Sequence, residues 1–232
     1  MADNSKKISK LKKAPQGYIP LKYYNLFWIF ILCSVIGLLI ETLYQYFVFG
    51  DLESRASLVF GPFSTIYGVG GVLLTVFLNR IWDKNIFVIF IVSMVVGMAL
   101  EFFTSWAMEA LFGITAWYYG GMWGNIGGRT SIGFGIMWGM LGVLWIRFLL
   151  PWVLRIINLI PFRWHIVFTV AMSIFMALDI AVTLVATNRW YERERGIPAT
   201  NVIQQQCDRM FPDTFMEDRF QNATMYPSSA AR

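Results

Sequence analysis

The chain has 232 residues, of which 57% are hydrophobic and only 14% are charged. These are too few polar side chains to cover a water-soluble globule of this size, so a soluble globular protein is excluded. The net charge is +5, and apolar stretches run almost continuously from residue 25 to residue 187. The sequence therefore predicts an all-α polytopic membrane protein, with one transmembrane domain at 25–187 and polar segments on either side.

A lysine-rich arm, residues 1–24, precedes the first apolar stretch. It contains a single acid, Asp3, and six lysines: Lys6, Lys7, Lys10, Lys12, Lys13 and Lys22. Such a run can form a nucleic-acid patch, but ahead of a membrane span it favours a cytoplasmic orientation signal that also attracts acidic lipid headgroups. We therefore expect membrane lipids, and no nucleic acid, as the partner of this arm.

Five apolar segments approach the roughly 20 residues that a membrane crossing needs. They are residues 25–49, 61–79, 86–112, 130–150 and 166–187. With the arm inside, the short inner loops carry five Lys/Arg and the outer loops two, as the positive-inside rule requires. An odd number of spans then places the polar C-terminal tail, residues 188–232, outside. Residues 151–165 alternate apolar residues with Arg between two prolines, which predicts a short helix lying in the interface plane.

Two parts of the sequence match each other and predict an internal duplication. The matching positions are Gly37 with Gly97, Glu41 with Glu101, and RASLVFG at 55–61 with RTSIGFG at 129–135. Because each unit holds two spans, both copies cross the membrane in the same sense. We therefore expect two same-sense helical hairpins, repeat one at about 25–80 and repeat two at about 86–150, followed by a fifth helix at about 166–187.

Five ionisable residues lie within the predicted spans or at their outer ends. They are Glu41, Arg55, Glu101, Arg129 and Asp179. A lone carboxylate inside a bilayer costs on the order of 2.5–3.5 kcal/mol by insertion scales, so these side chains should face the bundle interior. Small residues at four-residue steps precede each glutamate and allow close helix packing. We expect the three acids to meet the two arginines near the outer face, either within one repeat or between repeats.

Two interpretations of this cluster stay open. The charges can lock the hairpins together, since each needs a partner in a low-dielectric medium, or they can line a cavity that binds a polar group or relays protons. No catalytic residue is assigned, because the P-loop, G-x-S-x-G and H-E-x-x-H motifs are absent and His165 is the only histidine. We expect no cofactor and no metal, because any carboxylate site would have to tolerate the two arginines.

Several motifs carry a resemblance to a known family. In the first half they are Gly37-x-x-x-Glu41-x-x-Tyr44, Arg55-x-x-Leu58-x-x-Gly61-Pro62 and Ile66-Tyr67-Gly68-x-Gly70, and in the second half Glu101-x-x-Thr104-Ser105, Trp117-x-Tyr119, Asn125 and Gly128-Arg129. Over roughly residues 25–150 the chain resembles small bacterial membrane proteins classed as putative type IV ABC-transporter permeases. It departs from the family pattern at Ala56, Thr65 and Tyr118, where the family has Gly, Pro and Asp.

The resemblance implies a permease subunit in the cell membrane that depends on a separate ATPase subunit or on self-association into a homo-oligomer. Residues 151–165 are the candidate element for docking an ATPase. The residues that would contact cargo or lock the bundle are Glu41, Arg55, Glu101, Asn125, Arg129 and Asp179. Two alternatives are a membrane enzyme that acts on a lipid or envelope intermediate, with a glutamate as general acid/base and an arginine holding a phosphate, and a structural or assembly protein without a substrate.

Overall fold

The structure is a computed structural model that describes residues 17–221. Most of the predicted lysine-rich arm, including Lys6 to Lys13, lies outside the described residues. The described part is mostly helical, and it contains helices long and apolar enough to cross a membrane. The expected class, a helical protein that crosses the membrane several times, is confirmed at this level.

The elements follow one another in a simple order. They are α2 (Tyr23–Phe49), α3 (Thr65–Leu78), α4 (Ile86–Phe112), β1 (Asn125–Ile126), β2 (Thr130–Ser131), α5 (Ile132–Leu144), a π-helical turn (Trp145–Leu149), α6 (Leu150–Ile157), a 3-10 turn (Phe162–Trp164), α7 (His165–Glu194), α8 (Val202–Met210) and α9 (Asp213–Arg219). Within residues 17–221, four helical segments are long enough to span: α2, α4, the continuous segment Ile132–Ile157 and the segment Phe162–Glu194. The remaining apolar helix, α3, has 14 residues, fewer than a straight crossing needs.

The short length of α3 has a local cause in the sequence. Gly61 adopts a positive φ of 65°, and Pro62 follows it, so a helix cannot continue through this point. The helix therefore begins only at Thr65. In the matching segment of the second repeat no proline intervenes, and α5 starts directly after Ser131, whose Oγ caps it by accepting a hydrogen bond from the Phe134 N–H at 3.3 Å.

The segment expected to lie in the interface plane, residues 151–165, is arranged differently. Its first part, α6, continues the line of α5, and only residues 158–164 form a connection. The cause is the π-helical turn before Pro151, in which the Leu150 N–H bonds to the Trp145 carbonyl. This five-residue turn accommodates a proline that would otherwise interrupt the ladder of hydrogen bonds. The fourth apolar helix thus extends to Ile157, beyond the expected end at residue 150.

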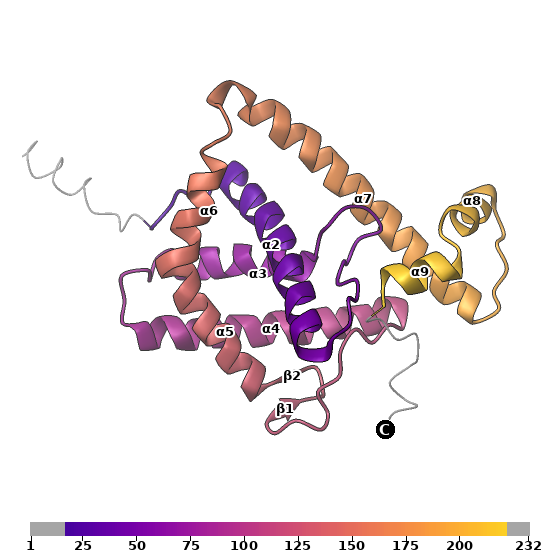
Figure 1. Cartoon of the computed structure of the whole chain (residues 1–232), viewed down its shortest axis with the longest axis horizontal. Helices are drawn as coiled ribbons and strands as arrows, with labels where there is room; N and C mark the ends of the chain where they lie inside the picture. The colour runs from indigo at the N-terminus through magenta and orange to yellow at the C-terminus, as the bar shows by residue number, and fades with distance from the viewer. Residues whose placement is uncertain (1–16, 222–232) are drawn as a thin grey trace, which may run out of the picture.

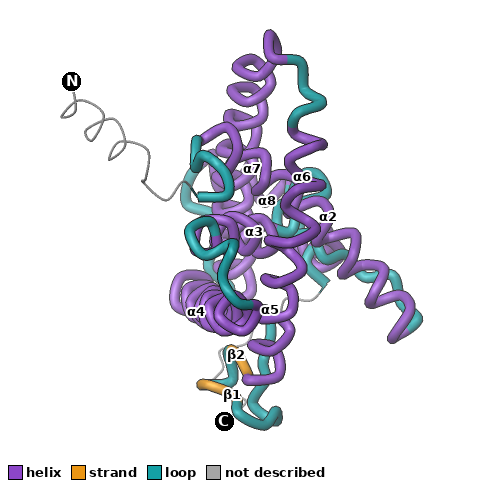
Figure 2. Tube along the Cα trace, turned by 90° about the vertical axis from the view of Figure 1, so that its left-hand side faces the viewer, coloured by secondary structure: helices purple, strands orange, loops and turns teal. Residues whose placement is uncertain are grey.

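The helices pack as two neighbouring pairs with α7 at one side. The most extensive helix contacts are α4 with α5 and α2 with α3, and α3 joins the pairs by packing on α4 (Figure 1). Side chains buried where these helices meet include Ile29, Leu74 and Ile89. A second core joins α7 to α8 and α9 around Trp190 and Met216. Figure 2 shows β1 and β2 as a small ribbon beyond α4, beside the start of α5.

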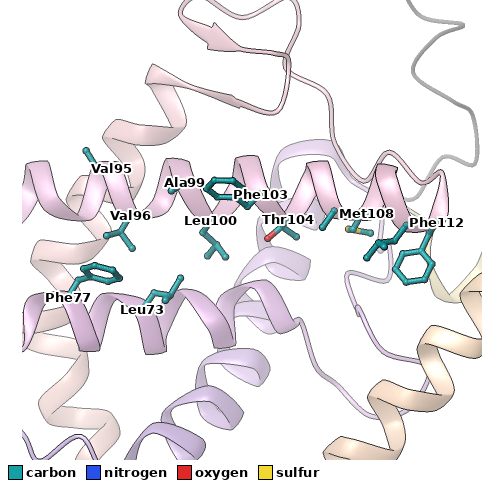
Figure 3. A pocket seen from close by; sticks show the side chains of 12 residues that line it. Leu73, Phe77, Val95, Val96, Ala99, Leu100, Phe103, Thr104, Met108 and Phe112 are labelled. Carbon is teal, nitrogen blue, oxygen red and sulfur yellow. The ribbon is translucent and has the colours of Figure 1, made fainter.

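Apolar side chains also cover the outside of the bundle, as a lipid environment requires. Examples are Ile40, Phe47 and Ile166, each more than half exposed. Because α3 is shorter than α4, an apolar groove of about 620 Å³ lies along the two helices. Leu73 and Phe77 of α3 line it opposite α4, and Thr104 is its one polar lining residue (Figure 3).

Candidate functional site

Each hairpin closes over a glycine one helical turn before its glutamate. A Cβ atom on Gly37 would lie 2.3 Å from Cγ of Tyr67, and one on Gly97 would lie 2.0 Å from Cγ of Trp138. Only glycine therefore lets these aromatic rings of α3 and α5 lie against α2 and α4. Residues four apart share a helix face, so Glu41 and Glu101 are directed to the same interfaces as the two glycines.

The first glutamate, Glu41, lies between a tyrosine and an arginine. Its carboxylate interacts with the Tyr67 hydroxyl and, over a longer distance, with the charge of Arg55. The direct ion pair of Arg55 is to Glu53, with 2.9 Å between Nη2 and Oε2. Gln45 donates to the same Glu53 oxygen at 3.3 Å. Glu41 is thus near the arginine that the sequence predicted, but its closest polar partner is a neutral hydroxyl.

The second glutamate, Glu101, is 6% exposed and has neutral partners. Thr130 donates its hydroxyl to Oε2 of Glu101 at 2.8 Å, and the carboxylate also interacts with the side chain of Trp138. Thr130 is itself 1% exposed and belongs to β2, next to Arg129. The second repeat therefore directs a hydroxyl, and not its arginine, at the buried carboxylate.

Tyr119, from the loop between α4 and β1, links the two hairpins. Its ring stacks on Phe134 with 4.3 Å between centroids. Burial raises the pKa of the Tyr119 phenol above its usual range, and the charges of Glu101 and Glu41 raise it further. Tyr67 likewise interacts with both carboxylates. Because both carboxylates act electrostatically on both phenols, we refer to Glu41, Glu101, Tyr67 and Tyr119 together as the carboxylate–tyrosine cluster.

The other predicted residues of the second repeat stabilise its loop. Arg129 forms an ion pair with Glu109 near the end of α4 and donates through Nη1 to Oγ of Ser105 at 3.2 Å. Asn125 donates to the Met122 carbonyl at 2.9 Å and accepts from the Gly128 N–H at 3.1 Å. The direct ion pair of each predicted arginine is therefore to an acid outside the expected set, Glu53 for Arg55 and Glu109 for Arg129.

Asp179 of α7 is 2% exposed and contacts the loop after α2. It accepts hydrogen bonds from the Phe60 N–H at 3.2 Å and from the Thr183 hydroxyl at 3.4 Å. Its charge interacts with Arg219 of α9, where burial lowers the pKa of the guanidinium and Asp179 opposes that change. Asp179 thus has a different arginine as its neighbour from the two that we expected.

Four residues at these sites were not among the predicted ones: Tyr67, Thr130, Tyr119 and Arg219. Both tyrosines belong to motifs shared with the family, but they were missed because the site was predicted from charged residues. Thr130 occupies the position of Ala56 in the duplicated segment, and this hydroxyl was a usable signal. Arg219 gave no signal, because its position depends on the C-terminal segment folding back across 161 residues to the Leu58 carbonyl.

These features define a class: a helical membrane protein whose two hairpins each hold a carboxylate at their interface, half-buried at Glu41 and buried at Glu101. The profile of a family described as putative ABC-transporter type IV matches residues 28–184, more than half of the chain. The protein belongs to this family. The match extends past residue 150, the expected limit of the resemblance, and includes most of α7 with Asp179. No significant match was found among curated proteins or among solved structures.

Proposed function

We propose that this protein is the permease subunit of a transporter and that its carboxylate–tyrosine cluster contacts the cargo. Membership of the transporter family supports the general role. The cluster supports the specific one, because intramembrane carboxylates are costly and are usually kept for function. Glu41 and Glu101 come from the first helix of each hairpin, so a cargo bound between them would touch both halves of the bundle.

The observation that carries this proposal is the neutral character of the closest partners. A structural lock would place a cation directly on each carboxylate, whereas Glu101 has Thr130 and Trp138 and Glu41 has Tyr67. Arginine charges are instead directly paired to Glu53 and Glu109. The two carboxyl groups are therefore not already occupied by a directly paired cation, and they stay available to a cargo that carries a cation, a proton or several hydrogen-bond donors.

The energy for transport comes, in this proposal, from a separate ATPase subunit. The chain has no P-loop motif of its own. The connection between α6 and α7 presents Leu159 and Phe162, which are 78% and 89% exposed, beside Arg155 and Arg163. His165 at its end stacks on Tyr24 with 4.4 Å between ring centroids, which fixes the connection to the start of α2. This segment is the docking element that we assign to the ATPase.

We also propose an orientation in which the start of α2 faces the cytoplasm. The lysine-rich arm and the arginines of the α6–α7 connection then lie on the inner side, as the positive-inside rule favours. The polar C-terminal tail, including α8 and α9, then lies outside, because the end of α3 returns to the inner side, where the Asn79 carbonyl accepts from the Tyr18 N–H at 2.9 Å. A reporter fused after Arg232 tests this assignment, and a cytoplasmic signal would contradict it.

The cargo role is tested by replacing the two carboxylates with isosteric amides. Glu101→Gln keeps an oxygen that accepts from Thr130, so the fold should persist while the charge is lost. We expect Glu41→Gln, Glu101→Gln and the double variant to reach the membrane at normal levels and to fail in complementing a deletion strain. Glu194→Gln, at an exposed position at the end of α7, is the matched control and should complement fully.

Two results would contradict the proposal. Full complementation by the double variant at normal expression would show that the cluster does not contact the cargo.

The dependence on an ATPase has its own test. Purification in mild detergent should recover a nucleotide-binding subunit together with ATP hydrolysis. Repeated failure to recover one, with wild-type protein that complements, would remove the dependence on an ATPase.

A further inference from the structure

A second site lies where α9 reaches the loop after α2. It is a pocket of about 430 Å³ between α2, residues 52–62 of that loop, and Arg219. Its walls combine two arginines with hydroxyl and apolar side chains: Arg55, Arg219, Thr42, Ser54, Leu38 and Leu52. The pocket is separate from the cluster, although Arg55 and Glu41 interact electrostatically.

Arg219 is held in place mainly by uncharged groups. Its Nε donates to the Leu58 carbonyl at 2.8 Å, and its Nη2 donates to the Gly61 carbonyl. No ion pair to Arg219 within 4.0 Å is found among residues 17–221, and the charge of Asp179 acts on it from a longer range. The backbone therefore positions this guanidinium without neutralising it.

Arg55, on the opposite wall, is only partly neutralised. Its Nη2 is paired to Glu53, but Glu53 also accepts from Gln45. Within the described part of the chain, no hydrogen bond engages Nη1 of either Arg55 or Arg219. Two guanidinium groups and one carboxylate give the lining residues a formal charge of +1. Glu41 and Asp179 act on these guanidinium groups without lining the pocket, so the pocket surface itself favours an anion.

The geometry matches a phosphate better than a carboxylate. Guanidinium groups bind phosphate oxygens through several parallel hydrogen bonds, and the hydroxyl-bearing residues Thr42 and Ser54 line the same space. A phosphate offers enough acceptor oxygens to engage donors on both walls. The pocket is also large for a free ion, which leaves room for the group to which the phosphate is attached.

The apolar wall indicates what that group is. Leu38 and Thr42 belong to α2, the first membrane-spanning helix, and Leu38 lies one turn deeper than Thr42. The arginines lie toward the loop end of the same helix. A ligand in this position meets charge at the headgroup level and hydrocarbon below it, which is the layout of a phospholipid.

We infer that the Arg55–Arg219 pocket binds the phosphate group of an anionic membrane lipid. The site is independent of transport, because it is defined by lipid binding and needs neither cargo nor ATPase. None of its lining residues belongs to the carboxylate–tyrosine cluster. One electrostatic interaction, of Arg55 with Glu41, connects the two sites. The C-terminal segment therefore completes a lipid site that the membrane helices alone do not form.

The test measures binding by the purified full chain in detergent. Short-chain phosphatidic acid is titrated while intrinsic tryptophan fluorescence and the melting temperature are followed. We expect saturable binding, weakened about tenfold or more by Arg55→Gln and by Arg219→Gln, since each removes charge-assisted hydrogen bonds to the phosphate. Arg209→Gln removes an equal charge from an exposed position of α8 and should bind as the wild type does.

Two further measurements distinguish a lipid phosphate from inorganic phosphate and keep the test informative if an arginine variant misfolds. Inorganic phosphate should bind at least about tenfold more weakly than the lipid, because it cannot use the apolar wall. Leu38→Trp fills that wall without changing a charge and should weaken only the lipid, so it remains informative if Arg219→Gln loosens α9. Equal binding of inorganic phosphate and lipid would overturn the lipid assignment. Wild-type affinity for the lipid in both Arg55→Gln and Leu38→Trp would show that this pocket is not the binding site.

Failure to detect lipid binding leaves the transport proposal intact, because complementation by the glutamate variants tests a different site. Conversely, lipid binding that persists in Glu41→Gln and Glu101→Gln, while complementation is lost, would support both proposals separately.

Discussion

The loops that follow α2 and α4 both contain the sequence Arg-x-Ser, at residues 55–57 and 129–131. They are nevertheless stabilised by different parts of the chain. The first loop, residues 50–64, is bonded by segments far away in the sequence: α7 through Asp179, and α9 through Arg219. The second loop, residues 113–131, is largely bonded to itself, through the β1–β2 ladder and Asn125. A longer loop can satisfy its own backbone groups, whereas a shorter one needs partners from elsewhere.

The two matching segments of sequence thus adopt different local structures beside similar pairs of helices. The Arg-x-Ser pattern remains in both copies, yet in the first copy Ser57 bonds to Thr65 across a bend, while in the second copy Ser131 caps α5 directly. The second loop is longer and the first contains Pro62, and different segments cover the two hairpins. The first loop is bonded to α7 and to the C-terminal segment.

The largest effect should come from separating that segment from α7. Arg189 is 1% exposed and pairs with Asp208 at 2.8 Å and with Glu192. Arg189→Ala breaks a buried pair and should destabilise the attachment of α8 by about 3–5 kcal/mol. Chymotrypsin cleavage after Phe60 in the first loop should then accelerate, while cleavage after Trp123 in the second loop should not change.

Arg195→Ala is the control for this variant, since among residues 17–221 Arg195 donates only to the Tyr191 hydroxyl and lies over the ring of the same residue. It should leave both cleavage rates at the wild-type level. Equal acceleration at Phe60 and Trp123 in Arg189→Ala would show that the two loops share their support, contrary to the comparison drawn above.

A smaller effect should appear when the two hairpins are overpacked at matching positions. Gly97→Ala places a methyl group against Trp138, and Gly37→Ala places one against Tyr67. Each should lower the free energy of unfolding by about 1–3 kcal/mol because the rings cannot retreat without moving a helix. Thermal unfolding in detergent measures the loss. Gly121→Ala, where a Cβ would meet nothing within 4 Å, should be neutral.

The support of the first loop should also weaken in acid. The guanidinium of Arg189, with that of Arg193, holds the pKa of Asp208 below its usual value. A carboxylate with a lowered folded-state pKa stabilises the fold above its unfolded pKa of about 3.9, and the contribution is lost as the pH falls through the folded value. We expect the melting temperature to fall below about pH 4 less steeply in Asp208→Asn than in the wild type.

Glu217→Gln, on an exposed face of α9, is the control for that titration and should keep the wild-type profile. An Asp208→Asn profile identical to the wild type would assign the acid sensitivity to other carboxylates.

The smallest effect should come from Asn125→Ala in the second loop. This change removes the hydrogen bonds to the Met122 carbonyl and from the Gly128 N–H. Because the loop is partly solvated, the expected cost is about 1 kcal/mol. Cleavage after Trp123 should accelerate with no change at Phe60, the reverse of the Arg189→Ala result. A change at Phe60 would show that the second loop also supports the first.

Much of the helical arrangement could be predicted because membrane helices carry a strong local signal. The segments expected at 25–49 and 86–112 became α2 and α4 with ends shifted by at most two residues. The start of α3 shifted to Thr65 because of a local effect at Gly61 and Pro62. The extension through Pro151 was missed because a π-helical turn leaves no clear mark in the sequence.

The candidate site could be predicted only in part, for a related reason. Intramembrane carboxylates such as Glu41 and Glu101 stand out in an apolar span, so they were found from the cost of burying a charge alone. Their partners did not stand out, because a threonine or tyrosine is unremarkable at an interface. Arg219 and Asp179 approach each other only through tertiary contacts between α7, α9 and the first loop, which no local pattern encodes.

The fold-back of α9 also orders events during synthesis. The ribosome completes α2 and the first loop early, whereas Arg219 emerges only after all the apolar helices have entered the bilayer. Until then the carbonyls of Leu58 and Gly61 have no guanidinium to bond. A nascent chain interrupted after α7 would therefore be inserted but unfinished, with an open first loop that quality-control proteases can recognise.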